Sequence, residues 1–206
     1  MNQILDTNFK GKHKINKRFF KFQFIISFIL FAFFIFLLIY YTFPRKNQEK
    51  FSKQLIENYE IYKLYSNNNS YTQTKTSSTD NLFGIIEIPK INLYYPIFSN
   101  ISEELLKTAP CKMYGTSPNE RGNICIAGHN YNNNMFFSKI STLTVNDKIY
   151  LHDISSNRYV YKVFELSEVL ETDLSPIFDY NNNFKQLTLI TCNNFNSNRI
   201  IIKAKQ

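Results

Sequence analysis

The strongest constraint on this chain is residues 22–43, a run of 22 residues without a charged side chain. A helix of about 20 apolar residues crosses the roughly 30 Å hydrocarbon core of a bilayer. Tyr40 and Tyr41 lie near the end of the run, where amphipathic rings favour the membrane interface. A cleavable signal peptide would have a shorter apolar region and a small-x-small site, whereas this run leads into YYTFPRK. The sequence therefore predicts one uncleaved transmembrane anchor.

Most of the net charge of +8 flanks this segment. Residues 1–21 carry six Lys or Arg and one Asp, a balance that favours a cytoplasmic N-terminus and an extracellular C-terminal domain. Residues 42–53 are basic too, so the opposite orientation, with that domain in the cytosol, stays open. Residues 81–206 carry twelve basic and eleven acidic side chains. No basic stripe is left for a phosphate backbone, and we expect no nucleic-acid partner.

The chain beyond the anchor divides into a linking part and a folded part. Apolar residues recur at spacings of four, four and three from Phe51 to Tyr62, which indicates an amphipathic helix over residues 45–65. Residues 66–81 are almost entirely polar and are typical of a flexible tether. The predicted organisation is a basic cytoplasmic tail (1–21), a transmembrane anchor (22–43), a stalk helix and linker (44–81) and a folded domain (82–206).

The folded domain is predicted to be all-β. A short helix is expected from Ser102, because two glutamates in the first turn suit the helix dipole. The remaining pattern consists of short apolar or alternating runs between turn residues, which favours a closed barrel or a sandwich. The seven predicted strands cover residues 82–88, 92–98, 123–129, 148–152, 158–166, 186–192 and 199–204.

The stretch TLITCNNFNSNR, residues 188–199, carries the most specific chemical signal. If the last two predicted strands form a hairpin, Cys192 lies opposite Arg199 and Ile190 opposite Ile201, with each pair sharing a face. A slip of one residue would turn the arginine away. A guanidinium beside the sulfur can favour thiolate and donate hydrogen bonds to an oxyanion, although it cannot act as a base.

A cysteine nucleophile also needs a group that moves protons near neutral pH, and histidine is the usual choice. His13 lies in the cytoplasmic tail, and His152, beside Asp153, is expected to be a satisfied surface residue. His129 ends the strand NICIAGH directly after Gly128, at a strand end where side chains can converge on an exposed site. The residues themselves therefore favour His129 as the partner of the cysteine.

Three motifs in this order resemble the sortase family, the membrane-anchored cysteine transpeptidases of Gram-positive cell surfaces. They are IAGHN at residues 126–130, TLITC at 188–192 and the following Arg199. The likeness covers about residues 82–206. It implies a closed eight-stranded sortase-type β-barrel, with an eighth short strand near residues 112–114. It also places the family's catalytic residues on His129, Cys192 and Arg199.

The resemblance implies a reaction, partners and a location. Cys192 would attack an LPXTG-like sorting signal of a secreted protein, and a thioester would form while His129 protonates the departing amine. An amino group of a peptidoglycan precursor would then take over the acyl group. Arg199 would bind the substrate backbone or the oxyanion. The protein would be a single-pass cell-membrane protein whose catalytic domain faces the cell wall.

Further site residues follow from the same resemblance. Ala127 and Ile190 are expected to line the groove for the sorting signal. Val169 and Leu170 fall where the family has its specificity loop, residues 167–178 here, and are expected to contact substrate, with ordinary packing as the open alternative. Some relatives bind calcium beside this loop. Glu168, Glu171 and Asp173 lie there, but the earlier loop offers only Glu120, so we expect no metal and no other cofactor.

Several alternatives remain at this stage. The short spacing from His129 to Cys192 and the single apolar span favour a class A, D or E sortase, and class D weakly among these. GHN followed by MF at residues 135–136 resembles class B instead, so the motifs conflict. Cys125 is expected to be a small buried core residue, with a second functional thiol or a bond to Cys111 left open. A barrel that binds without catalysis, or an exported thiol peptidase that mainly hydrolyses, would give a similar sequence.

Overall fold

The N-terminal part of the protein is one long helix. The computed structural model describes residues 17–68, 81–131, 134–178 and 183–206. Its internal contacts divide the chain into two compact units, residues 1–46 and 47–206. Helix α1 (Lys17–Asn68) contains a stretch, Lys21–Tyr40, that is long and apolar enough to cross a membrane. This helix is compatible with the predicted single-pass anchor.

Helix α1 differs in one respect from the prediction of an anchor and a separate stalk helix. It continues through Pro44, which removes one backbone donor but does not end the helix. The residues that follow are rich in Arg, Lys, Gln and Glu, which are good helix formers. The predicted tether at residues 66–81 lies for the most part outside the described residues.

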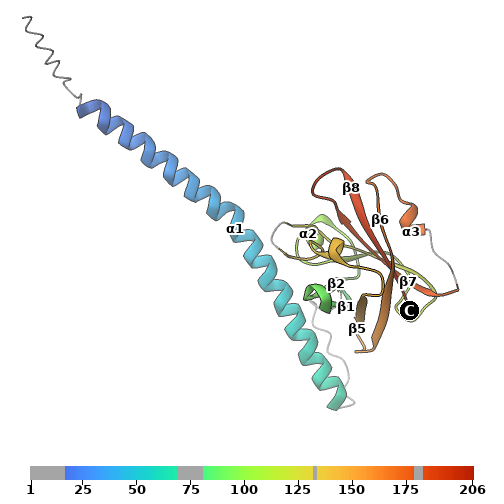
Figure 1. Cartoon of the computed structure of the whole chain (residues 1–206). Coiled ribbons are helices and arrows are strands. Elements are labelled where there is room, and N and C mark those ends of the chain that lie inside the picture. The colour runs from blue at the N-terminus through green and yellow to red at the C-terminus, as the bar shows by residue number, and fades with distance from the viewer. Residues whose placement is uncertain (1–16, 69–80, 132–133, 179–182) are drawn as a thin grey trace, which may run out of the picture. The chain divides into compact units, whose positions relative to one another are not determined.

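The C-terminal part is a closed barrel of eight strands, which confirms the predicted all-β fold (Figure 1). Around the barrel the strands follow the order β1-β2-β3-β4-β7-β8-β6-β5, and β1 pairs with β5 to close it. Neighbours are antiparallel except for the pairs β2–β3 and β4–β7. The strands are β1 (Leu82–Ile88), β2 (Leu93–Phe98), β3 (Cys111–Gly115), β4 (Gly122–Ala127), β5 (Lys148–Asp153), β6 (Arg158–Leu170), β7 (Lys185–Cys192) and β8 (Asn198–Lys205).

Four short helices lie in the described connections between the strands. The predicted helix at Ser102 is confirmed as α2 (Glu103–Leu106), where the Ser102 hydroxyl accepts a hydrogen bond from Leu105 N at 3.2 Å. The others are α3 (Ser175–Phe178), η1 (Pro89–Ile91) and η2 (Ile140–Thr142).

The main core lies inside the barrel. It consists of the side chains on the inward face of each long strand, because alternate residues of a strand point inward. The segment between β4 and β5 adds Phe137, Ile140 and Leu143, all buried, to this core. A smaller cluster joins Leu55, from the C-terminal half of α1, to Phe98 and Cys111. The barrel is therefore a filled scaffold, and its chemistry must lie on its outer face or at its rims.

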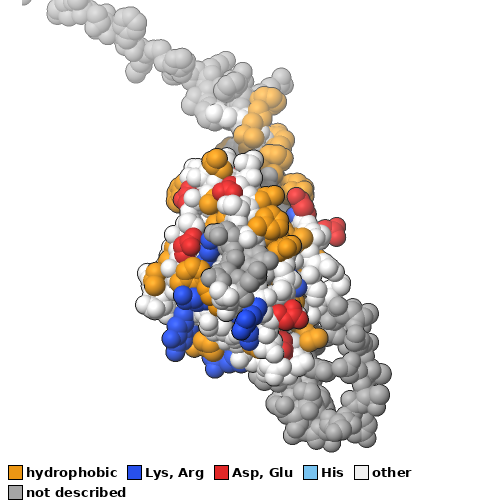
Figure 2. Space-filling model, turned by 90° about the vertical axis from the view of Figure 1, so that its right-hand side faces the viewer, with side chains coloured by type: hydrophobic (Ala, Val, Ile, Leu, Met, Phe, Trp, Pro, Cys, Tyr) orange, Lys and Arg blue, Asp and Glu red, His pale blue; other side chains and the backbone are white. Residues whose placement is uncertain are grey.

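The barrel surface carries charges of both signs. On the face seen in Figure 2, acidic side chains lie among basic ones. His152, expected to be a satisfied surface residue, is held on the outside of the barrel by Glu87, with Nε2 and Oε2 2.9 Å apart. That expectation is confirmed for this histidine.

Candidate active site on the barrel rim

Cys192 and Arg199 face each other at the end of the β7–β8 hairpin. The register pairs Cys192 with Arg199 and Ile190 with Ile201, as the alternation in the sequence predicted. Nη1 of Arg199 lies 3.4 Å from Sγ of Cys192. The thiol is partly exposed and the guanidinium is about one-third exposed. A nucleophilic atom and a permanent cation therefore meet at a rim that solvent and substrate can reach.

Three hydrogen bonds tie the segment that carries His129 to the strand that carries Cys192. Strand β4 ends at Ala127 and runs parallel to β7. Beyond the ladder, Gly128 N donates to Ile190 O at 3.0 Å, and Thr191 Oγ1 donates to Gly128 O at 2.6 Å. Asn130 Nδ2 donates to Cys192 O at 2.8 Å. His129 is the residue between the two that are tied down, so its backbone is fixed beside the end of β7.

Position 128 requires a glycine because the ring of Phe137 lies too close to the backbone there to leave room for a side chain. A Cβ there would lie 2.7 Å from a ring carbon of Phe137, which is shorter than real contacts allow. The buried Phe137 ring therefore packs directly against the backbone next to the histidine, and Phe137 N donates to His129 O at 3.1 Å. The Gly-His pair in the sequence thus reflects how the core supports the rim from below.

The environment of His129 favours its neutral form. Its ring lies against that of Tyr131, with centroids 4.9 Å apart. Partial burial lowers the pKa of His129 below its usual 6.5, a shift that Lys107 reinforces and Glu103 opposes. An imidazole that is neutral near pH 7 can accept a proton from a thiol or an amine.

The other two cysteines are held apart from this chemistry. Cys111 and Cys125 are both buried and unbonded to each other, so the disulfide that the sequence left open is absent. Burial raises the pKa of Cys111 to about 11 and that of Cys125 to about 12. Cys125 is a core residue, as expected from its position, and Cys192 is the one partly exposed thiol of the barrel residues described.

The outer face that carries Cys192 extends over four neighbouring strands, β4, β7, β8 and β6. Ala127 pairs with Ile190 across the β4–β7 ladder, and both are half-buried. Val169 pairs with Arg199 across β6–β8 and so shares their face. Leu170 pairs with Asn198, points to the opposite face and is 66% exposed. The structure therefore brings Ala127, Ile190 and Val169 to the face of the thiol, but not Leu170.

Strand β6 extends four residues beyond its predicted end at residue 166, so Val169 and Leu170 belong to a strand rather than to a loop. The extension follows from its partner, because β8 runs far enough to pair with residues up to Leu170. A helix turn, α3, then lies over the same outer face. There Asn123 Nδ2 donates to Ile177 O at 3.1 Å, and Thr188 Oγ1 donates to Asn123 Oδ1 at 2.8 Å.

The acidic side chains around the site already have partners. Glu171 Oε2 lies 3.5 Å from Nη2 of Arg199, so this carboxylate holds the far side of the guanidinium. Glu168 accepts from Asn196 and Asn198, and Asp173 accepts from Ser175 N. Glu120, in the earlier loop, accepts from Ser117 N. Within the described ranges, no three His, Cys, Asp or Glu side chains are grouped as a metal site would require.

Sequence reasoning missed Asn130 and Thr191. Thr191 alternates with Cys192 and points to the other face, so periodicity gave no reason to connect it with the site. Asn130 had one usable signal, an amide directly after the proposed catalytic histidine. The hydrogen bonds of these two residues join segments that are about sixty residues apart. The register between β4 and β7 brings the segments together, and neither the GH motif nor the TLITC motif reveals that register.

The geometry of the rim defines a class of enzyme. A partly exposed thiol, a guanidinium in contact with it and a histidine on a segment bonded to the same strand are the groups that thiol-dependent acyl transfer requires. The family model of the sortase domain matches residues 86–206. The chain belongs to the sortase family.

Solved structures agree with this assignment. Sortase A of Listeria monocytogenes is 28% identical, with a TM-score of 0.55, over 61% of this chain and 87% of that one. A sortase D5 transpeptidase of Clostridium perfringens is 26% identical, with a TM-score of 0.59, over 77% and 98%. A sortase C of Clostridium perfringens, solved with a C-terminal cell wall sorting motif, is 24% identical and shares the fold, with a TM-score of 0.55 over 83% and 97%. No curated protein matches the sequence.

Proposed function

We propose that this protein is a cysteine transpeptidase. It cleaves an LPXTG-like sorting signal of secreted proteins through a thioester on Cys192 and transfers them to an amino group of a cell-wall precursor. The observation that carries the proposal is the contact between Arg199 Nη1 and Cys192 Sγ, 3.4 Å, on a strand to which the His129 segment is bonded. Neither Cys192 nor Arg199 is a buried core residue of the barrel.

The first half of the reaction forms the thioester. The Cys192 thiol gives its proton to the His129 imidazole, and Sγ attacks the carbonyl carbon of the scissile amide. The negative charge that develops on the carbonyl oxygen accepts hydrogen bonds from Arg199, whose planar fork has several donors. The C–N bond then breaks, and the departing amine takes its proton from the His129 imidazolium.

The second half regenerates the enzyme. The acceptor amine attacks the thioester carbonyl and gives a proton to His129, while Arg199 again stabilises the oxyanion. The C–S bond breaks, and Cys192 recovers its proton from His129. The lowered pKa of His129 suits this role, because the imidazole is free to accept a proton near neutral pH.

The outer face beside the thiol supports a peptide substrate. Ala127 and Ile190 form a half-buried apolar strip next to Cys192, and Val169, also half-buried, lies beyond Arg199 on the same face. An apolar residue of the sorting signal lying on this strip would place a later amide at the sulfur. The apolar stretch Lys21–Tyr40 supports anchoring of the domain in the cell membrane. The basic residues before it favour the barrel on the outside, where secreted proteins and the cell wall are found.

The direct test uses the full chain in detergent micelles with a library of peptides that vary around an LPXTG-like sequence. Mass spectrometry follows cleavage, and an added amine such as triglycine reports transfer. We expect one group of related peptides to be cleaved within the motif and joined to triglycine. Cys192→Ala should abolish both products, whereas Cys111→Ala, a buried thiol elsewhere in the barrel, should retain them.

Two results would contradict the proposal. Cleavage by Cys192→Ala at the wild-type rate would exclude the thiol as nucleophile. Cleavage by the wild-type protein with hydrolysis as the sole outcome at every amine concentration would instead make it an exported thiol peptidase.

A further inference from the structure

The six residues between Cys192 and Arg199, NNFNSN, form the β7–β8 loop and include four asparagines. Cys192 and Arg199 are the last pair of the β7–β8 ladder before this loop, so their contact depends on the loop staying closed. Across the loop, Asn193 N donates to Asn198 O at 2.9 Å, and Asn198 N donates to Asn196 Oδ1 at 2.9 Å. Opening of the loop would let the two strand ends separate, and the thiol and the guanidinium with them.

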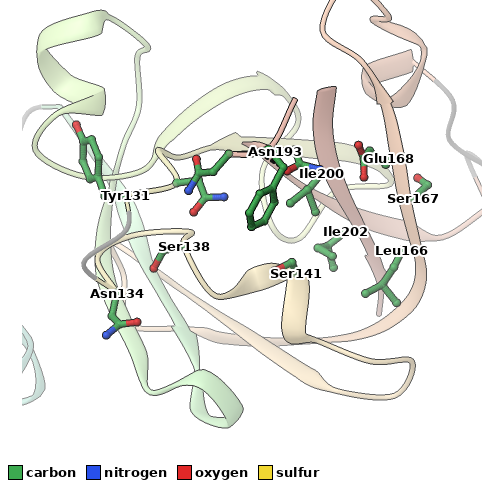
Figure 3. Close-up of a pocket in the computed structure, with 13 residues that line it drawn as sticks. Tyr131, Asn134, Ser138, Ser141, Leu166, Ser167, Glu168, Asn193, Ile200 and Ile202 are labelled. Carbon is green, nitrogen blue, oxygen red and sulfur yellow. Dashed lines mark hydrogen bonds between the residues drawn. The ribbon is translucent and has the colours of Figure 1, made fainter. Parts of the chain in front are cut away.

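A carboxylate on the neighbouring strand binds this loop from outside it. Glu168 lies near the end of β6, next to Ile200 of β8 (Figure 3). Asn196 Nδ2 donates to Glu168 Oε1 at 2.9 Å, and Asn198 Nδ2 donates to the same oxygen at 2.8 Å. Hydrogen bonds from the side chains of Asn196, Asn198 and Asn193 hold the pKa of Glu168 below its usual value, so this carboxylate is charged near neutral pH. The asparagines of the loop therefore converge on one acceptor.

The side chain of Glu168 is not on the reactive face. Glu168 pairs with Ile200, which alternates with Arg199 along β8, so its side chain points to the opposite side of the sheet from the guanidinium. Within the described residues, its hydrogen bonds go to the amides of the loop alone. We propose that Glu168 is a positioning residue, which holds the β7–β8 loop closed and thereby keeps Arg199 against Cys192; this assignment rests on the proposed transpeptidase function.

The second glutamate beside the hairpin is less suited to this role. Glu171 Oε2 lies 3.5 Å from Nη2 of Arg199, and the Glu171 side chain is 52% exposed. A long, exposed ion pair is screened by solvent and restrains its partners weakly. Glu168 is exposed too, but it accepts two short hydrogen bonds, and the Asn196 amide that donates one of them is itself fixed by the loop backbone. The link from β6 to the loop is therefore the stronger restraint on the hairpin end.

The test compares two variants of Glu168 in the full chain in detergent micelles, with the sorting peptide that the wild-type protein cleaves best. Glu168→Ala removes both hydrogen bonds and should lower kcat about 3–10-fold with little change in KM, because the outer face that binds the peptide is unaltered. Both bonds end on one oxygen, which the carbonyl oxygen of a glutamine can replace, so Glu168→Gln should keep kcat within about twofold of wild type.

Hydrogen exchange followed by mass spectrometry measures closure of the loop without relying on activity. In Glu168→Ala, residues 193–198 should exchange faster than in the wild-type protein, and the other strands of the barrel should exchange at the wild-type rate. Glu120→Ala is the matched control. Glu120 is also an exposed carboxylate that binds a loop, through Ser117 N, but it lies in the connection before β4, at the other end of that strand from His129. This control should keep the wild-type kcat and the wild-type exchange of the β7–β8 loop.

Four results would decide against the proposal or its basis. An unchanged kcat in Glu168→Ala, or an equal loss in Glu120→Ala, would overturn it. A loss in Glu168→Gln as large as in Glu168→Ala would also overturn it, because the hydrogen bonds would then not be the cause. Faster exchange throughout the barrel in Glu168→Ala would show a general stabilising role instead of a positioning one. Failure of the wild-type protein to form any thioester would contradict the transpeptidase function itself, while the exchange of residues 193–198 would still test the closure of the loop.

Discussion

Cys125 and Cys192 lie on the same outer face of two neighbouring parallel strands, yet their surroundings are opposite. Cys125 lies within the β4–β7 ladder and is completely buried, with Asn123 Nδ2 3.1 Å from its sulfur and α3 above it. Cys192 lies at the free end of the pair, partly exposed, with a guanidinium 3.4 Å away. Burial raises the pKa of Cys125 to about 12, so this thiol stays protonated in the physiological range.

The difference shows that position along one sheet face determines whether a thiol is a core residue or a reactive group. Both ends of the β4–β7 pair use polar side chains to join strands that are distant in sequence. At the buried end, the bonds from Asn123 and Thr188 hold α3 and stabilise the fold. At the free end, the bonds from Asn130 and Thr191 hold reactive groups in place.

The largest expected effect at the free end comes from Arg199→Lys. An ammonium is a point charge and cannot reproduce the planar pair of donors, so loss of oxyanion stabilisation should lower kcat about 10²–10³-fold. Steady-state cleavage of the best sorting peptide measures this. Arg158→Lys is the matched control, because that guanidinium stacks on Tyr150 on the outside of the barrel. Near-normal turnover in Arg199→Lys would remove the arginine from the mechanism.

A smaller effect is expected from Asn130→Ala, which breaks the bond to the Cys192 carbonyl. A net hydrogen bond of about 0.5–1.5 kcal/mol corresponds to a kcat about 3–10-fold lower, with KM for the peptide nearly unchanged. Asn130→Asp should fare no better, because a carboxylate cannot donate the bond. Asn119→Ala, at a surface amide that accepts from Lys185, serves as control. An effect on KM alone would indicate that Asn130 contacts substrate instead of positioning the histidine.

The next prediction concerns the direction in which the pKa of His129 is shifted. Burial lowers its pKa, which means that the protonated form is disfavoured and appears at lower pH than in a free histidine. An NMR titration, with the His129 signal assigned by its loss in His129→Gln, should have its midpoint below pH 6.5. The acid limb of kcat/KM should follow it. A midpoint at or above pH 6.5 would mean that the imidazole is not desolvated as the structure indicates.

The smallest effect on catalysis, but a clear one on stability, is expected at the buried end. Asn123→Ala removes the acceptor of the Thr188 hydroxyl proton and the amide that donates to the α3 carbonyls, which costs about 1–3 kcal/mol. Thermal unfolding followed by near-UV circular dichroism should show Tm lower by several degrees, while thioester formation continues. An unchanged Tm would show that this network does not hold α3 in place.

Much of the fold was readable from local pattern. Alternation predicted seven strands, and the six-residue loop between residues 192 and 199 fixed the register that places Arg199 against Cys192. These features depend on neighbours in sequence, and for such features periodicity is a strong signal. Three strands departed from the pattern. Alternation did not predict β3, which only the family resemblance implied, and β4 ends at Ala127, two residues before its predicted end. The last four residues of β6 are strand because β8 pairs with them.

The features that depend on distant contacts were not predictable. The parallel register of β4 and β7 joins residues about sixty positions apart, so the bonds from Asn130 and Thr191 left no periodic trace. The same holds for the ion pair between Arg199 and Glu171. Residue types pointed to the chemistry, but their contacts required the folded barrel.

The most direct test of the account is to locate the acyl group on the protein. The full chain is mixed with a cleavable sorting peptide, quenched in acid within the first turnover and digested for peptide mapping by mass spectrometry. The account predicts one thioester, on the peptide that contains Cys192, and none on the peptides that contain Cys125 or Cys111. An acyl group on Cys125, or cleavage that leaves all three thiols unmodified at every time point, would contradict it.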